Sequence, residues 1–266
     1  MPAHDIIDAS LDADLELIRV AAEEAGRIAM GFFGRDPEVW MKAGVSPVSE
    51  ADYAVDAFLK SSLGAARPDY GWLSEETVDS PERLSARRTF VVDPIDGTRA
   101  FLERRNVWCV SIAVVEDGRP LAGVLDCPAR GEVYVASPGA GATLNGTRIS
   151  VRRPPEPPVV AGPKQLVAAL PEQYRPAKSH PYIPSLAYRI ALLARGSIDG
   201  TFVKANSHDW DLAAADLILA EAGGRVVDGK GRVLRYAGPD PAHGLLAAGS
   251  GPLLEKMVHA IAAPPR

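Results

Sequence analysis

Acidic residues stand in three separate segments of the chain where they could hold a cation and a phosphate group. In the central segment, the run DPIDGT from Asp93 to Thr98, two carboxylates precede a short helical pattern at 99–102. Carboxylate oxygens suit a hard cation such as Mg²⁺, and backbone N–H groups of Gly97 and Thr98 at a helix start suit a phosphate oxygen. Alone, the segment favours an ordinary strand-to-helix turn in which Asp96 caps the helix.

Two further acidic segments lie at the boundaries of expected elements. Glu75 and Glu76 follow the short apolar run 71–74, and Asp209 and Asp211 stand at the start of an apolar helical pattern. In isolation, the first is typical of a charged loop and the second of a helix cap. Two cations that bridge a phosphate group need about four carboxylates from separate segments. The three segments together therefore predict one metal and phosphate site.

The elements that must position these acids can be read from the hydrophobic pattern. Apolar residues spaced three and four apart predict helices from 11 to near 34, from 49 to near 64, at 185–194, at 209–222 and, more weakly, at 252–262. Short β-branched runs and turn residues predict strands at 89–92, 198–203 and 225–227, and an antiparallel meander over 108–136. This mixture predicts a layered α+β protein.

A proline-rich stretch at 154–163 separates two structured regions. We expect it to connect an N-terminal lobe, residues 1–150, that carries the metal and phosphate site, to a C-terminal lobe, residues 151–266, that supplies Asp211 and substrate contacts. The two lobes would form one compact catalytic unit.

The composition narrows the class of protein. With 266 residues and 47% hydrophobic side chains, the chain can bury a substantial core. A net charge of −5 argues against a nucleic acid polymer as partner, because such proteins carry clustered positive charge. The five histidines show no spaced pair typical of zinc. No signal-peptide pattern and no apolar stretch long enough for a bilayer is present, which predicts a cytoplasmic protein without a membrane partner.

Taken in order, the three acidic segments resemble the signatures of the inositol monophosphatase family, the lithium-sensitive, magnesium-dependent phosphatases. The matching strings are WLSEE at 72–76, VDPIDGTRAF at 92–101, and WDLAAA at 210–215 followed by EAGG at 221–224. The resemblance runs from about the first helix to Gly224. It implies hydrolysis of a small phosphorylated metabolite, and we expect an αβαβα sandwich with mixed, partly antiparallel sheets and a homodimer.

The resemblance also implies a ligand set for Mg²⁺. Glu75, Asp93 and the carbonyl of Ile95 would bind one Mg²⁺ ion, and Asp93, Asp96 and Asp211 would bind a second. A third, weaker site would lie near Glu75. Since residue 46 is serine where some family members carry an acid, the occupancy of this third site and the sensitivity to lithium are open.

Catalytic roles follow from the same resemblance. The segment 46–52 would form a loop over the site, where Asp52 hydrogen-bonds Thr98 so that the pair orients the attacking water. Glu75 would share in catalysis through its metal ion. The metal ions would activate that water and stabilise the leaving alkoxide, so that no covalent phosphoenzyme is needed.

The substrate is the least constrained part of this interpretation. Contacts to it are expected from Gly97, Thr98, Lys204 and Asp211. The resemblance implies that family members acting on inositol phosphate carry an acidic residue about six positions before the Trp-Asp pair, where it accepts hydrogen bonds from ring hydroxyls. Here that place falls at Lys204. Lysine cannot accept a hydrogen bond, but it can pair with a second anionic group. Together with SPVSEAD at 46–52, it favours the bisphosphate nucleotidase branch, which acts on 3′-phosphoadenosine 5′-phosphate.

Several alternatives stay open at this point. Lys204 is equally interpreted as an ordinary surface lysine in a variable loop. Inositol 1-phosphate is the second candidate substrate, ahead of histidinol phosphate and fructose 1,6-bisphosphate. A regulatory homologue without turnover is a different class of function, and the complete acid set argues against it.

Overall fold

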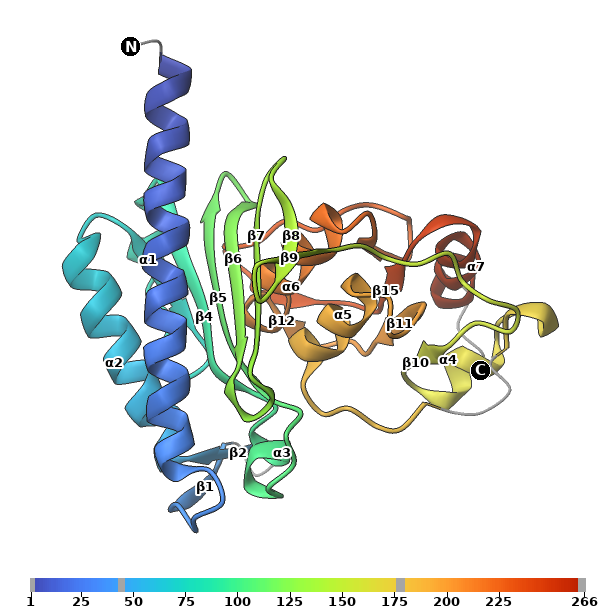
Figure 1. The fold of residues 1–266 in the computed structure, drawn as a ribbon, viewed down its shortest axis with the longest axis horizontal. Helices are drawn as coiled ribbons and strands as arrows, with labels where there is room; N and C mark the ends of the chain where they lie inside the picture. Colours follow the sequence, from blue (N-terminus) through green and yellow to red (C-terminus); the bar gives the residue numbers. More distant parts are fainter. Residues whose placement is uncertain (1–2, 43–45, 176–179, 263–266) are drawn as a thin grey trace.

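Helices and sheets alternate in five layers across the molecule, in the order αβαβα (Figure 1). The structure is a computed structural model that describes residues 3–42, 46–175 and 180–262. α1 and α2 cover one face of a large sheet, α5 and α6 form the middle layer, and α7 lies outside a second, smaller sheet (Figure 1). The expected α+β sandwich with mixed, partly antiparallel sheets is confirmed.

The described residues contain the following α-helices, given with their bounds: α1 Ala3–Phe32, α2 Glu50–Ala66, α3 Thr98–Leu102, α4 Lys164–Ala168, α5 Leu186–Ala194, α6 Asp209–Glu221 and α7 Gly251–Ala262. Each predicted helix is present. α2 runs through Gly64 rather than ending there, because a glycine inside a helix costs only about 1 kcal/mol relative to alanine. None of these described helices is long and apolar enough to cross a membrane.

The large sheet has seven strands that follow one another in sequence order. The strands are β3 Gly71–Ser74, β4 Arg88–Asp96, β5 Cys109–Glu116, β6 Arg119–Cys127, β7 Glu132–Ser137, β8 Gly141–Leu144 and β9 Thr147–Ile149. Only β3 and β4 are parallel, and every later pair is antiparallel. The predicted meander corresponds to β5, β6 and β7. The short strands β8 and β9, which extend it, were not predicted.

The small sheet has the order β10-β11-β15-β13, with one parallel pair, β10 and β11. Its strands are β10 Val160–Ala161, β11 Gly200–Val203, β13 Arg225–Asp228 and β15 Leu246–Gly249. Two further antiparallel pairs are β1 Val39–Lys42 with β2 Ser46–Ser49, and β12 Ser207–His208 with β14 Ala242–His243. Residues 46–49, expected in a loop, therefore form a strand of a hairpin, whereas 43–45 and the side chain of Ser46 lie outside the described part.

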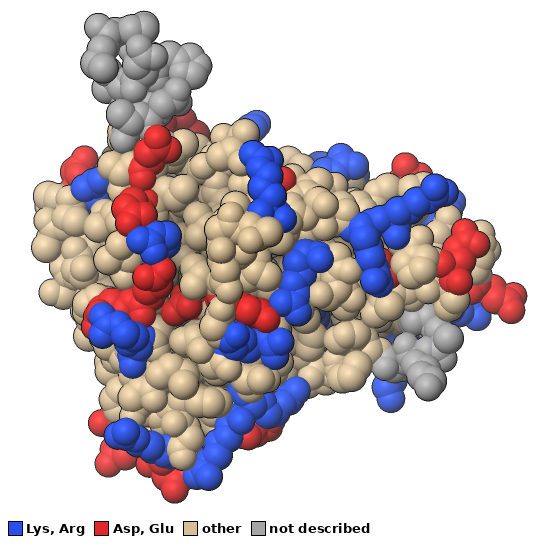
Figure 2. All heavy atoms as spheres, viewed as in Figure 1, with Lys and Arg blue, Asp and Glu red and all other residues tan. Residues whose placement is uncertain are grey.

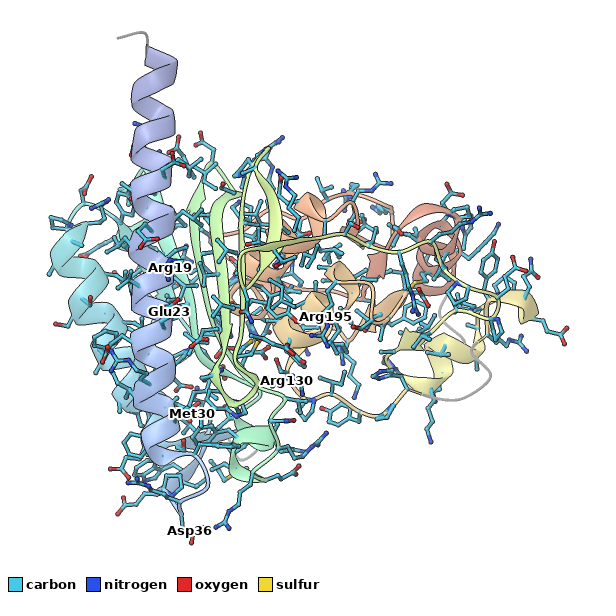
Figure 3. All side chains as sticks on the ribbon, viewed as in Figure 1. Arg19, Glu23, Met30, Asp36, Arg130 and Arg195 are labelled. Atoms are coloured by element: carbon cyan, nitrogen blue, oxygen red, sulfur yellow. The ribbon has the colours of Figure 1, made fainter. Side chains whose placement is uncertain are left out.

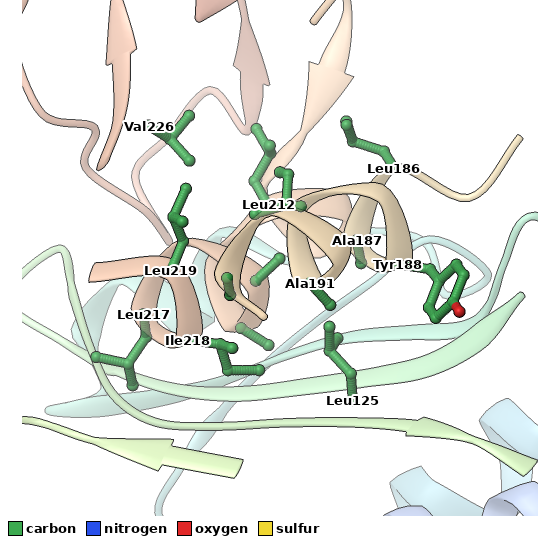
Figure 4. Packing of buried hydrophobic residues seen from close by; sticks show 14 of the residues in the cluster. Leu125, Leu186, Ala187, Tyr188, Ala191, Leu212, Leu217, Ile218, Leu219 and Val226 are labelled. Carbon is green, nitrogen blue, oxygen red and sulfur yellow. The ribbon is translucent and has the colours of Figure 1, made fainter. Parts of the chain in front are cut away.

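The middle layer brings the two sheets together. Aliphatic side chains of α5 and α6 pack against each other and against Leu125 of β6 (Figure 4). α6 approaches the large sheet closely at Gly123, where an added Cβ would lie 3.1 Å from the backbone of Ala214. A larger residue at this point of β6 would force the backbone of α6 to move by a few tenths of an ångström. The packing fixes the start of α6, which carries Asp211, against the strands that carry the other acids.

On the outer face of the large sheet, α1 buries the small residues Ala22, Ala25 and Ala29. Arg19 lies on its solvent side, where it pairs with Glu16 and with Glu23 (Figure 3). Both signs of charge are interspersed on the face shown in Figure 2, with acidic side chains gathered along α1. α1 is therefore an amphipathic helix held by small side chains on one face and by surface ion pairs on the other.

Candidate metal and phosphate site

The parallel pair β3 and β4 places Glu75 beside Asp93. Ser74 is in register with Val92, and the N–H of Glu75 donates to the carbonyl of Val92 at 3.3 Å. The carboxyl ends of parallel strands lie at one edge of a sheet. Glu75, which follows Ser74, and Asp93, which follows Val92, therefore lie side by side at this edge. Two of the three acidic segments meet for this reason.

β4 changes register against β5 between Asp93 and Asp96, and this irregularity shapes the turn. Oδ1 of Asp93 accepts a hydrogen bond from the N–H of Ile95 at 3.0 Å. Gly97 has φ of +97° and packs on Ser185, where an added Cβ would lie 2.9 Å from the Ser185 Cβ. Only glycine satisfies both the backbone angle and the close contact. Thr98 then opens α3.

Asp211 joins these acids from the start of α6. Its Oδ2 accepts a hydrogen bond from the N–H of His208 at 2.7 Å, so it does cap the helix. One carboxylate oxygen from each of Asp93, Asp96 and Asp211 lies within 4.8 Å of the others. Capping and convergence are thus compatible, because a carboxylate has about four lone-pair sites.

Asp96 caps a helix far along the chain rather than the one that follows it. Its carboxylate accepts hydrogen bonds from the Ser185 hydroxyl at 2.6 Å, from the N–H of Leu186 at 3.1 Å and from the N–H of Ala187 at 2.6 Å. These groups form the start of α5. The sequence interpretation placed Ser185 at the start of this helix, as expected for an N-cap serine, but did not connect it with Asp96.

Burial and mutual repulsion disfavour the ionised forms of the three aspartates. Burial raises the pKa of Asp93 well above its ordinary value, and the charges of Glu75, Asp96 and Asp211 raise it further. Burial also raises the pKa of Asp211, and of Asp96 to about 6 even though hydrogen bonds from Ser185 and Ala187 lower it. A divalent cation would relieve this repulsion directly.

The donor set fits such a cation. Oδ2 of Asp93 is buried and has no hydrogen-bond partner among the described residues. An orphaned buried carboxylate oxygen beside two other carboxylates costs free energy unless a cation or water satisfies it. The converging ligands are oxygens alone, which suits Mg²⁺ rather than zinc.

Thr98 and Asp52 are in hydrogen-bonding contact beneath these acids. The Thr98 hydroxyl lies 3.0 Å from Oδ1 of Asp52 and 3.1 Å from the Ile95 carbonyl, and it can donate to either. The other Asp52 oxygen accepts from the N–H and the hydroxyl of Ser49, at 2.8 and 2.6 Å. Asp52 is therefore fixed from the start of α2, and the lone pairs of the Thr98 oxygen are available to a further donor.

Glu75 is engaged by a lysine that the sequence interpretation did not consider. Nζ of Lys42, from β1, lies 3.4 Å from Oε1 of Glu75, 3.3 Å from its carbonyl and 2.5 Å from Oε1 of Glu76. Glu75 is not one of the residues whose oxygens converge within 4.8 Å. Burial raises the pKa of Glu76 to about 7, although Lys42 lowers it. An ammonium group thus pairs with Glu75, whose own charge is close enough to raise the pKa of Asp93.

A cavity of about 670 Å³ is separated from the carboxylates by Leu186, which belongs to the cavity wall and also donates its N–H to Asp96. None of the aspartates is among the described residues that line the cavity. Lys204 is exposed and lines the same cavity, as does Arg189 of α5. Sequence reasoning missed Arg189, because one arginine within an apolar helical pattern carries no signal of its own.

Known proteins are similar to this chain along most of its length. The model of the inositol monophosphatase family matches residues 11–264. The chain is 32% identical to a histidinol-phosphatase of Chlorobaculum parvum, over 82% of this chain and 87% of that protein. It is 30% identical to the 3′(2′),5′-bisphosphate nucleotidase CysQ of Aggregatibacter actinomycetemcomitans, over 81% and 84% respectively. The IMPase of Thermotoga maritima superposes with a TM-score of 0.78 at 25% identity, covering 97% of each chain. On its sequence, its layered fold and its cluster of carboxylates, the chain belongs to the inositol monophosphatase family of phosphatases.

Proposed function

We propose that the protein is a magnesium-dependent phosphomonoesterase whose metal ligands are Glu75, Asp93, the Ile95 carbonyl, Asp96 and Asp211. The observation that carries the proposal is the convergence of one carboxylate oxygen from each of the three aspartates, together with a buried Oδ2 of Asp93 that has no hydrogen-bond partner among the described residues. Two Mg²⁺ ions held there would supply Lewis acidity to the phosphate group and lower the pKa of the attacking water. In this proposal, the Lys42 ammonium moves away from Glu75 when Glu75 binds a metal ion.

The remaining steps belong to the chain's own residues. Because the Asp52 carboxylate can only accept, it draws the Thr98 proton toward itself, and the Thr98 oxygen then accepts a hydrogen bond from water. This orients a lone pair of the water toward phosphorus. The N–H groups of Gly97 and Thr98 precede the first intrahelical hydrogen bonds of α3, and they would hold a phosphate oxygen during the reaction.

For the substrate, we propose 3′-phosphoadenosine 5′-phosphate. Lys204 supports a second anionic group, because it lines the cavity on the far side of Leu186 from the carboxylates and cannot accept a hydrogen bond from a sugar hydroxyl. The similarity to a bisphosphate nucleotidase supports the same substrate. Inositol 1-phosphate is the second candidate on the family membership. Histidinol phosphate follows on the similarity to a histidinol-phosphatase, and fructose 1,6-bisphosphate comes last.

The test compares phosphate release from these four esters by kcat/KM in millimolar Mg²⁺, with Asp93→Asn as the inactive control. We expect the nucleotide to be hydrolysed with the highest kcat/KM. A tenfold preference for inositol 1-phosphate, equal to about 1.4 kcal/mol of transition-state discrimination, would refute the argument from Lys204. Absence of hydrolysis of all four esters by the wild-type protein would count against the phosphatase proposal itself.

A further inference from the structure

Asp56 of α2 holds both ends of the short segment that carries Glu75. Its Oδ1 accepts a hydrogen bond from the Ser74 hydroxyl at 2.5 Å, and its Oδ2 accepts one from the Thr77 hydroxyl at 2.7 Å. Ser74 directly precedes Glu75, and Thr77 lies two positions after it. One carboxylate therefore ties together the two ends of the segment 74–77.

Few other contacts fix the shape of this segment. Among residues 75–77, only Glu75 makes a backbone-to-backbone hydrogen bond to another described residue, which lies in β4. The N–H of Glu76 donates to the Ser74 hydroxyl at 3.3 Å. Val78, the next residue along the chain, is 92% exposed. The conformation of the segment thus depends on side-chain acceptors rather than on regular secondary structure.

The surroundings of Asp56 show what it contributes. Asp56 is 8% exposed and Ser74 is 3% exposed, so the contact between them is shielded from water. Among the described residues no basic side chain pairs with Asp56, which accepts side-chain hydrogen bonds from the two hydroxyls alone. A buried carboxylate without a cation costs free energy, and packing alone would favour an apolar residue at this place. The contacts to segment 74–77 are therefore what Asp56 supplies.

The same helix also holds the other half of the site. Asp52 lies one turn before Asp56 on the same face of α2, and its Oδ1 accepts a hydrogen bond from the Thr98 hydroxyl. Segment 74–77 and the start of α3 are far apart in the chain, yet both are attached to this one helix. A helix holds such groups more precisely than a loop does.

We propose that Asp56 is a positioning residue for the metal ligand Glu75. By holding segment 74–77, it keeps the Glu75 side chain beside Asp93 without contacting the ion or the substrate. The inference rests on the proposed function, which makes Glu75 a ligand of Mg²⁺. A ligand that is already held in place loses less conformational freedom when the ion binds. Groups that orient metal ligands typically contribute about 10- to 100-fold in metal affinity.

Calorimetric titration with Mg²⁺ in the absence of substrate measures this contribution apart from catalysis. Asp56→Asn keeps the shape of the side chain, but its amide nitrogen cannot accept, so one of the two hydroxyls loses its partner. We expect this variant to bind Mg²⁺ at least fivefold more weakly than wild type. Thr77→Val removes one donor without a change of charge and should weaken binding at least threefold. Because both changes break the same contact, the double variant should bind about as weakly as Asp56→Asn alone.

Two further variants serve as controls. Thr77→Ser retains the hydroxyl and should bind Mg²⁺ within twofold of wild type. Asp69→Asn removes one exposed negative charge just before β3, and it should also bind within twofold if net charge is not the cause. Thermal melting verifies the folding of each variant. The Thr77 variants change a partly buried side chain, and they remain as the test should Asp56→Asn unfold.

A positioning role also predicts rescue by the ion. Glu75 is intact in Asp56→Asn, so saturating Mg²⁺ should restore kcat to within threefold of wild type. The Mg²⁺ concentration at half-maximal rate should rise at least fivefold. Loss of a merely structural contact would instead lower Tm and leave this concentration unchanged.

The outcomes separate the two proposals. If folded Thr77→Val binds Mg²⁺ within twofold of wild type, or if Asp69→Asn weakens binding as much as Asp56→Asn, the positioning role is refuted, whereas hydrolysis by wild type still supports the phosphatase proposal. If the variants weaken binding as expected but wild type hydrolyses no ester, the positioning role stands and the phosphatase proposal falls. If wild type does not bind Mg²⁺, the metal site and the role of Asp56 in it are both refuted.

Discussion

Asp52 and Thr98 are 46 positions apart in the chain, yet the Thr98 hydroxyl lies 3.0 Å from the Asp52 carboxylate. Asp52 lies in the first turn of α2, and Thr98 is the first residue of α3. Both side chains are buried. The orientation of the Thr98 hydroxyl is therefore set by a carboxylate that can only accept, and it is not free to rotate with the solvent.

We expect Asp52→Asn to lower kcat by about 10²-fold or more, with little change in KM, because groups that position a transferred proton typically contribute about 10²–10⁴-fold. Ser49 and Thr98 both donate to Asp52, and the amide nitrogen of asparagine cannot accept from either. Ser49→Ala is the matched control, since it loses a helix-cap contact worth about 1 kcal/mol but keeps the contact to Thr98. A kcat within threefold of wild type in folded Asp52→Asn would rule out this orienting role.

Asp93→Asn should make the metal-free protein more stable while abolishing activity. Burial and neighbouring charges raise the pKa of Asp93, so its ionised form opposes folding near pH 8, and the neutral amide has nearly the same shape. We expect a gain of about 1 kcal/mol or more, or roughly 2–4 °C in Tm. Asp93 is a cleaner choice than Asp96, whose replacement would also disturb the start of α5.

Magnesium should stabilise the wild-type protein much more than the Asp93→Asn variant. Wild type should gain about 2.7 kcal/mol of stability when Mg²⁺ is present at 100 times its Kd, and Asp93→Asn should gain much less. Calorimetric scans with and without millimolar Mg²⁺ measure both differences. Equal stabilisation of the two proteins would show that Asp93 is not a metal ligand.

Features marked by neighbouring residues could be predicted from the sequence alone. Gly97 and Thr98 follow Asp96 directly, and strings such as WLSEE mark strand ends, so three acidic segments and the helices could be predicted. Contacts between distant segments left no such mark. The sequence suggested a capping role for Asp96 only at the adjacent helix, as the alternative to metal binding, whereas its carboxylate accepts from the start of α5.

The missed charges share one physical cause. In the sequence, Arg189 and Lys42 resemble ordinary surface residues. In the folded chain, Arg189 lies on a cavity wall and Lys42 contacts Glu75. Burial and the distance to a partner arise only in three dimensions. Lys204, which the family pattern did single out, proved to be exposed at that same cavity.

Lys42→Met should tighten Mg²⁺ binding. The Lys42 ammonium neutralises Glu75 and Glu76 in the metal-free protein, and a cation that binds Glu75 must compete with it. Removal of the ammonium adds one negative charge to the site, so the Mg²⁺ midpoint in a Tm titration should fall by roughly threefold to tenfold, or about 1 kcal/mol. Lys60→Met, on the exposed face of α2, should leave the midpoint unchanged. A midpoint that rises in Lys42→Met would mean that the lysine assists binding of the cation.

A buried acid away from the site should make stability depend on pH. Asp126 of β6 is 5% exposed, and an added Cβ on Gly26 of α1 would collide with its carboxylate. Burial, with a smaller effect of Glu23, raises the pKa of Asp126 to about 7. The folded protein therefore holds a proton that the unfolded chain releases at its ordinary pKa near 3.8, so this residue makes stability fall as pH rises from about 4 to about 7.

Asp126→Asn removes this titration and keeps the shape of the side chain. We expect urea unfolding to show similar stability for the two proteins near pH 4, and a higher stability for the variant at pH 8, by more than about 1 kcal/mol. The difference between the two proteins isolates Asp126, because every other titrating group is present in both. The same difference at pH 4 and pH 8 would show that Asp126 titrates alike in the folded and unfolded chains, and that its contact with α1 carries no electrostatic cost.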